Sequence, residues 1–160
     1  MYILPGALAP LAFYRQFVLV LFMPKREDNG TLIPGETIKL PMNPHGRVKL
    51  AEVQPTHGFP SYEGANAHNP ANWMAVNEAS ALADSLPVPD GAIKWGVGFT
   101  ITAADDIVCF DLDKCRGVMG GWIPEVATML AELPGAVELS NSGIGLHVWG
   151  RYRGVAPVHG

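Results

Sequence analysis

The chain has few cysteines, few basic residues and no long apolar run. Two cysteines among 160 residues cannot make a disulfide framework and favour a reducing, cytoplasmic setting. Only 11 lysines and arginines stand against 15 acidic residues, a net charge of −4. This balance excludes the broad basic face of a typical nucleic-acid binder, so any such contact is expected to be local. The apolar N-terminus is interrupted at Arg15 and Gln16, and we expect neither a signal peptide nor a membrane span.

Nearly half of the residues, 48%, are hydrophobic, which predicts a globular chain folded as one domain over residues 1–160. Asn69 and Pro70 have the pattern of a helix start and predict a helix that ends near Leu86. A second helix is expected at 124–133. Strands are expected at 16–22, 37–40, 96–101, 107–112, 137–140 and 145–150.

Proline, glycine and asparagine are frequent between residues 43 and 70, which predicts a long loop there. Strands 96–101 and 107–112 are expected to form a hairpin across residues 102–106. The order of elements indicates an α+β fold, with a small, mainly antiparallel sheet and helices packed on it.

The segment from Ile107 to Cys115 is the most informative of the chain. An apolar run is followed by Asp111 and Asp113, and residues two apart in a strand share a face. Two carboxylates so placed repel each other unless a cation lies between them. Mg²⁺ or Mn²⁺ would suit them, because these ions prefer oxygen ligands and leave positions open for phosphates. The alternative is that one aspartate caps the next helix and the other is solvated.

A second segment, from Glu138 to Trp149, has a glycine-rich centre followed by a strand. Ser142, Gly143 and Gly145 allow close approach of an anion to backbone N–H groups and hydroxyls. His147 follows in an alternating segment and is expected to point toward the pocket of Asp111 and Asp113. The alternative is an ordinary strand histidine without a functional role.

Together these motifs resemble the bifunctional DNA primase/polymerase domain of phage and plasmid replication proteins, in the archaeo-eukaryotic primase superfamily. The resemblance covers roughly residues 16–153. The matching segments are Lys39-Leu40-Pro41, Asn69-Pro70-Ala71-Asn72-Trp73, Glu78-Ala79, Gly96–Phe99, Asp111-Leu112-Asp113-Lys114-Cys115 and Glu138–His147.

The resemblance implies a core like the RNA-recognition motif and metal-dependent nucleotidyl transfer on a DNA template, from nucleoside triphosphates to a primer or an initiating nucleotide. Asp111 and Asp113 would hold Mg²⁺ or Mn²⁺, and His147 would contact the triphosphate. The remaining implied roles are nucleotide binding by Ser140, Ser142, Gly143 and Lys39, and DNA binding by Arg151 and Arg153. Ordinary solvated charge is the alternative for Lys39, Arg151 and Arg153.

The resemblance also implies a third acidic residue downstream of His147, which the sequence lacks. We therefore expect an N-terminal fragment of a longer replication protein, with a helicase domain in the same or a partner chain, in a bacterial or phage-infected cytoplasm. As an isolated chain it is expected to be weakly active or inactive. Two alternatives remain open: a nucleotide- or DNA-binding module without catalysis, and a phosphatase of the haloacid-dehalogenase type, whose first motif is also Asp-x-Asp.

Overall fold

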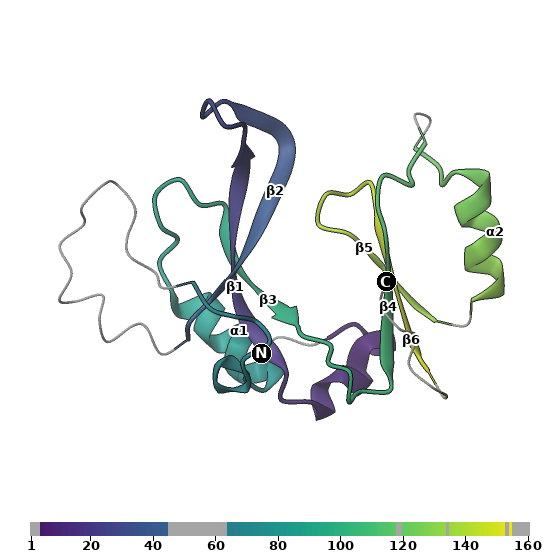
Figure 1. The fold of residues 1–160 in the computed structure, drawn as a ribbon, viewed down its shortest axis with the longest axis horizontal. Coiled ribbons are helices and arrows are strands. Elements are labelled where there is room, and N and C mark those ends of the chain that lie inside the picture. Colours follow the sequence, from purple (N-terminus) through teal and green to yellow (C-terminus); the bar gives the residue numbers. More distant parts are fainter. Residues whose placement is uncertain (1–3, 45–63, 118–119, 134, 153, 155–160) are drawn as a thin grey trace. The chain divides into compact units, whose positions relative to one another are not determined.

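The computed structural model describes residues 4–44, 64–117, 120–133, 135–152 and 154. The chain divides into two compact units, Met1–Thr100 and Ile101–Gly160, which are coloured along the sequence in Figure 1. Each unit has its own sheet and its own α-helix, and each is described by itself.

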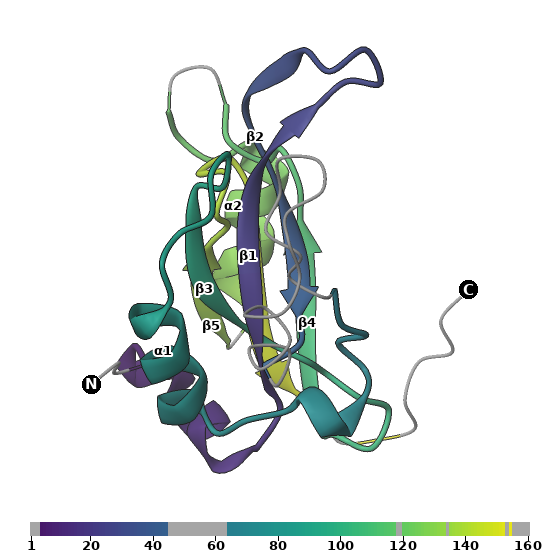
Figure 2. The ribbon, with the colours of Figure 1, turned by 90° about the vertical axis from the view of Figure 1, so that its left-hand side faces the viewer.

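The sheet of the first unit contains β1 (Phe17–Arg26), β2 (Leu32–Met42) and β3 (Lys94–Phe99). β1 is central and pairs antiparallel with both neighbours, as Figure 2 shows. The six residues from Phe17 to Phe22 are all buried. A continuous apolar run is what a strand needs when both of its faces are covered.

The helix predicted from Asn69 to Leu86 is divided in the structure. Asn69 does cap a helix, because its side chain accepts the N–H of Ala71 at 3.1 Å, but it caps only the 3₁₀ turn η3 (Pro70–Asn72). Met74 then exchanges two backbone hydrogen bonds with Phe17. This pairing holds the intervening residues extended, so α1 begins only at Val76 and ends at Ser85. Another 3₁₀ helix, η1, spans Gly6–Phe13.

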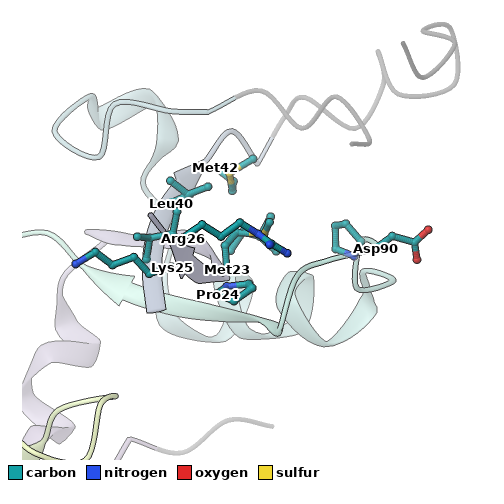
Figure 3. Close-up of a pocket in the computed structure, with 10 residues that line it drawn as sticks. Met23, Pro24, Lys25, Arg26, Leu40, Met42 and Asp90 are labelled. Atoms are coloured by element: carbon teal, nitrogen blue, oxygen red, sulfur yellow. The ribbon is translucent and has the colours of Figure 1, made fainter. Parts of the chain in front are cut away.

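A cavity of about 590 Å³ lies in the first unit, against the β1–β2 hairpin (Figure 3). Its lining is mainly apolar, with Lys25, Arg26 and Asp90 among the lining residues. None of the described residues that were predicted to bind metal, nucleotide or DNA lines this cavity.

The second unit contains β4 (Ile107–Leu112), α2 (Pro124–Glu132), β5 (Ala136–Leu139) and β6 (Leu146–Arg151). The strand order is β4-β6-β5, and both pairings are antiparallel. Val126 of α2 packs with Leu146 and Cys115 in a core that also includes Leu112, Trp122 and Leu130. Helix α2 thus covers one face of this sheet.

The predicted hairpin between 96–101 and 107–112 is wrong. β3 pairs with β1, while β4 pairs with β6. The end of β3 is tied to the start of β1, since Thr100 N–H donates to the carbonyl of Gln16 at 2.9 Å and the Gln16 amide donates back to the Thr100 carbonyl at 3.1 Å. A turn follows, in which the Asp105 carboxylate accepts the N–H of Thr102 at 2.7 Å.

The α+β class and the antiparallel pairing are confirmed, but two three-stranded sheets replace the single sheet that was expected. Of the predicted loop at 43–70, residues 45–63 lie outside the described part of the chain. The described part of this segment includes Gly64, which forms an isolated bridge with Met42, and Pro70, the first residue of η3. Among the described residues, no helix is both long and apolar enough to cross a bilayer.

Candidate functional site

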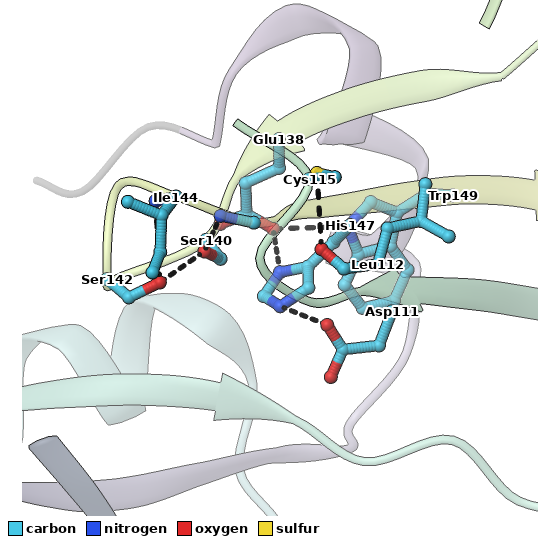
Figure 4. Close-up of polar contacts among 10 residues, drawn as sticks. Asp111, Leu112, Cys115, Glu138, Ser140, Ser142, Ile144, His147 and Trp149 are labelled. Carbon is cyan, nitrogen blue, oxygen red and sulfur yellow. Dashed lines mark hydrogen bonds and ion pairs between the residues drawn. The ribbon is translucent and has the colours of Figure 1, made fainter. Parts of the chain in front are cut away.

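Three ionisable side chains form a row across the second sheet (Figure 4). Asp111 of β4 pairs with His147 of β6, and His147 pairs with Glu138 of β5. Directly opposed residues of an antiparallel sheet point to the same face. Leu146 and Val148, which alternate with His147, are buried. The row therefore occupies the face opposite the one that α2 covers.

His147 lies between the two carboxylates. Its Nε2 is 3.6 Å from Asp111 Oδ1, and its Nδ1 is 3.3 Å from Glu138 Oε2. The imidazole is 17% exposed, against 66% for the side chain of Asp111. His147 thus lies beside Asp111, one of the two acids toward which it was expected to point. An imidazole flanked by carboxylates in this way can donate from one or both of its nitrogens.

Asp113 follows the end of β4 in an exposed turn. Leu112 still pairs with Leu146, and the N–H of Arg116 donates to the carbonyl of Ile144 at 3.1 Å. The short segment that carries Asp113 therefore runs beside the start of β6. Lys114 has a φ of +50°, in the left-handed region that a turn of this kind uses. Asp113 thus lies at the same end of the sheet as His147.

The turn between β5 and β6 contains the predicted phosphate-binding residues. The hydroxyls of Ser140 and Ser142 are 2.9 Å apart and hydrogen-bonded. Gly143 adopts a φ of +73°, which suits glycine because it has no Cβ. The structure brings Ser140, Ser142 and Gly143 together with Asp111 and His147 in one unit.

One expectation for this turn is wrong, because its donors are not all open to an anion. The N–H of Gly143 donates to the carbonyl of Ser140 at 2.9 Å, and the N–H of Gly145 donates to the Ser140 hydroxyl at 3.0 Å. These bonds close the turn on itself. One serine hydroxyl donates to the other, so one hydroxyl proton of the pair remains for an outside acceptor.

The predicted basic residues Lys39 and Arg151 belong to other parts of the two sheets. Lys39 is exposed on β2 of the first unit, opposite Phe22. Arg151 ends β6 and forms an ion pair with Asp106 at 3.1 Å. Arg151 is four residues from His147, roughly 13 Å along a strand. Arg153 lies outside the described residues.

Two residues were assigned no role from the sequence although they contact the site. Glu138 was noted only as the start of a motif, yet its Oε2 also accepts the indole N–H of Trp149 at 3.1 Å. Arg116 donates to the carbonyls of Gly143 and Gly120, at 3.1 and 2.9 Å. A hairpin register centred on the glycine-rich turn would have identified Glu138, because that register sets it opposite His147. Nothing in the spacing of Arg116 indicates its contact.

The surroundings of this face change the pKa of Cys109, which is two residues before Asp111 on the same strand. Burial, and then the negative charges of Asp111 and Glu138, raise the pKa of this thiol to about 11. An added negative charge is therefore disfavoured here. Burial, the larger cause, disfavours a charge of either sign, whereas the negative charges of Asp111 and Glu138, the smaller cause, would favour a cation.

The carboxylates at the end of β4 suit a hard divalent cation. Asp111 and Asp113 offer oxygen donors of the kind that Mg²⁺ and Mn²⁺ prefer, and both are exposed. Within the described ranges, no group of three or more His, Cys, Asp or Glu side chains is gathered closely enough to hold a metal ion. A cation bound by these two acids would therefore draw further ligands from water or from a substrate.

Compared with protein-family models and with curated protein sequences, the chain matches none of them.

Proposed function

We propose that this chain is a DNA primase/polymerase domain that transfers nucleotides from nucleoside triphosphates to a primer or initiating nucleotide on a DNA template. The observation that carries the proposal is the pairing of Asp111 with His147 across β4 and β6, beside the serine turn. It supports the proposal because acids able to bind a cation and hydroxyls able to donate to phosphate belong to one end of one sheet. We also propose that the chain has a core like that of the RNA-recognition motif.

In this proposal Asp111 and Asp113 hold Mg²⁺ or Mn²⁺. When bound, the metal supplies charge stabilisation for the attacking and leaving oxygens of phosphoryl transfer. The Nε2 of His147 lies 3.6 Å from Asp111, so a phosphate oxygen near this carboxylate would be within reach of the ring. The remaining hydroxyl proton of the Ser140–Ser142 pair serves as a second donor to the triphosphate.

The basic residues have supporting roles in the proposal. Arg151 and Arg153 contact the DNA backbone, and Lys39 contacts phosphate. To contact a phosphate, Arg151 would have to give up its ion pair with Asp106. This exchange costs little free energy, because exposed ion pairs are weak. The partners are a DNA template and primer, and a helicase domain in the same or a partner chain.

Primer extension tests the activity. The 160-residue chain and a version extended along its reading frame are incubated with primed template, nucleoside triphosphates and Mg²⁺ or Mn²⁺. We expect weak or no extension by the short chain and clear extension by the longer one, because a site with only two acids holds its ions poorly. Asp111→Asn should abolish the extension. Strong extension by Asp111→Asn would refute the proposed site.

A second candidate function is nucleotide binding without catalysis. It is favoured by the finding that only two acids stand at the end of β4, with no larger metal-binding group among the described residues. Metal-dependent triphosphate binding without extension in the longer chain would establish it. Hydrolysis of small phosphomonoesters would instead indicate the phosphatase alternative.

His147→Ala separates a ligand contact from a structural role. Because the partners of His147 are exposed carboxylates, we expect the loss of these two contacts to cost only about 1 kcal/mol of stability. Nucleotide affinity should fall about tenfold or more, which is at least about 1.4 kcal/mol. The measurements are the thermal midpoint and the affinity for a non-hydrolysable triphosphate with Mn²⁺. A large stability loss with unchanged affinity would make His147 an ordinary core histidine.

A further inference from the structure

Glu138 stands at the centre of a small network on the polar face of the second sheet (Figure 4). The pairing of β5 with β6 puts it opposite His147. Its Oε2 lies 3.3 Å from His147 Nδ1 and 3.1 Å from Trp149 Nε1. His147 and Trp149 are two apart on β6 and so share a face. One carboxylate oxygen thus joins two neighbouring side chains of the strand that carries the proposed nucleotide contact.

This contact favours Nδ1 as the protonated nitrogen of His147, because Glu138 Oε2 is within hydrogen-bond distance of Nδ1 at 3.3 Å and Asp111 Oδ1, 3.6 Å from Nε2, is not. An ionised carboxylate only accepts hydrogen bonds, so a ring that bonds Glu138 does so through Nδ1–H. The other nitrogen, Nε2, then faces away from Glu138 and toward Asp111. The indole N–H of Trp149 holds the same carboxylate oxygen from a second direction. The rotation of the imidazole and the position of its proton are therefore coupled to Glu138.

We propose that Glu138 is the positioning residue of His147. It keeps a proton on Nδ1 and turns Nε2 toward whatever Asp111 holds, where a bare Nε2 can bind a cation and an Nε2–H can donate to a phosphate oxygen. The identity of that ligand, a nucleoside triphosphate with its divalent cation, rests on the proposed function. In metal sites, residues that orient a ligating histidine in this way typically change affinity or activity about 10–100-fold when removed.

A purely structural role for Glu138 would be small. Its side chain is 45% exposed, and exposed ion pairs contribute little to stability. Its loss is therefore expected to act on the ring rather than on the fold. This difference makes the inference testable in a protein that remains folded.

The test is the tautomer of His147, read from long-range ¹H–¹⁵N correlations of the imidazole in the whole chain under alkaline conditions. His147→Ala assigns the signals. In the unsubstituted protein we expect ¹⁵N shifts of an Nδ1-protonated ring. In Glu138→Ala we expect a shift toward the Nε2-protonated form that solvated imidazole favours. Glu138→Gln keeps an acceptor oxygen and should retain the Nδ1 proton, while Glu132→Ala, an exposed acid of α2, should change nothing.

The exposed His68 gives an internal reference in the same spectra and should not respond to any of these changes. An unaltered His147 spectrum in Glu138→Ala would overturn the proposal. So would an Nε2-protonated ring in the unsubstituted protein.

Nucleotide affinity in the presence of Mn²⁺ is measured on the same variants. We expect about a tenfold loss in Glu138→Ala and a largely restored affinity in Glu138→Gln. A changed tautomer in a protein that binds no nucleotide would refute the proposed function and leave the positioning role in place. Normal nucleotide binding with an unchanged tautomer would refute the positioning role and leave the proposed function in place.

Discussion

At the scale of single residues, the site depends on close backbone approaches as much as on its charged groups. Gly145 shows this best. A Cβ at this position would meet the carbonyl oxygen of Leu112 at 2.7 Å and the hydroxyl of Ser140 at 2.9 Å. Glycine here lets the chain that follows β4 pass beside the serine turn. The carboxylates and the turn can share one end of the sheet only because this position has no side chain.

Gly145→Ala should therefore destabilise the protein by about 2 kcal/mol, because the contact is with backbone and cannot be relieved by a side-chain rotation. The measurement is equilibrium unfolding in urea. Gly121→Ala is the matched control, since a Cβ there meets nothing within 4 Å. Equal stability of the two variants would show that the turn and β4 are not packed as described.

Cys109 responds to its burial first and to the charges of the polar face second. Burial, with Asp111 and Glu138, raises its pKa from 9.0 to about 11, so the folded protein favours the neutral thiol. This contribution to stability is complete below about pH 9 and is lost as the pH rises toward about 11.

Because the thiolate is the reactive form, alkylation of Cys109 by iodoacetamide should still be rising at pH 10. Peptide mapping by mass spectrometry separates it from Cys115, which is buried in the core. A rate for Cys109 that levels off below pH 9 would contradict the assigned environment.

At the scale of elements, local patterns predicted the strands better than their pairing. The apolar run of β1 and the alternation in β6 were enough to identify them. Nothing local shows that Thr100 and Gln16 bond to each other, and this contact, 84 residues apart in the chain, accompanies the pairing of β3 with β1 in place of β4. The start of α1 was missed for a related reason, because the pairing of Met74 with Phe17 overrides the helix signal at Asn69.

The candidate site, like the fold, was predictable where a local motif identifies its residues and not where strand pairing sets the contact. Asp111, His147 and the serine turn could be found because each lies within a short motif. The partner of His147 on β5 requires the hairpin register, and the hydrogen bonds that close the turn depend on its detailed backbone conformation. Glu138 and the engaged N–H groups of Gly143 and Gly145 were therefore not anticipated.

Helix α1 has an electrostatic cap that can be tested. The Glu78 carboxylate accepts the N–H of Ala75 at 2.8 Å and forms an ion pair with Arg15 at 3.0 Å. The hydrogen bond from the Ala75 backbone, followed by the one from Arg15, lowers the pKa of Glu78. A lowered carboxyl pKa stabilises the fold above the unfolded value of 4.5, and this stabilisation is lost as the pH falls through the folded value.

Glu78→Gln should accordingly lower the thermal midpoint at neutral pH, and the difference from the unsubstituted protein should shrink in acid. Asp84→Asn, an exposed acid near the end of the same helix, should not lower the midpoint, because a negative charge is unfavourable at a helix C-terminus. A deficit of Glu78→Gln that is equally large at pH 7 and pH 3 would show that its charge is not the cause.

At the scale of the whole molecule, the two units contain different kinds of residue. The second unit, from Ile101 onward, contains the acids, the histidine and the serine turn. The first unit contains Lys39 and the apolar cavity. With a net charge of −4, the chain as a whole repels phosphate, so a bound divalent cation is what would make its acidic face attractive to a triphosphate. The central claim is therefore the cation site at the end of β4.

Isothermal titration of the whole chain with Mn²⁺, with and without a non-hydrolysable nucleoside triphosphate, tests that claim most directly. Asp111→Asn combined with Asp113→Asn is compared with Asp84→Asn combined with Asp90→Asn, which removes the same charge from exposed acids of the first unit. The account predicts Mn²⁺ binding that the triphosphate strengthens, that the first pair of substitutions abolishes and that the second pair leaves unchanged. Equal Mn²⁺ affinity in the unsubstituted protein and the Asp111/Asp113 variant would contradict it.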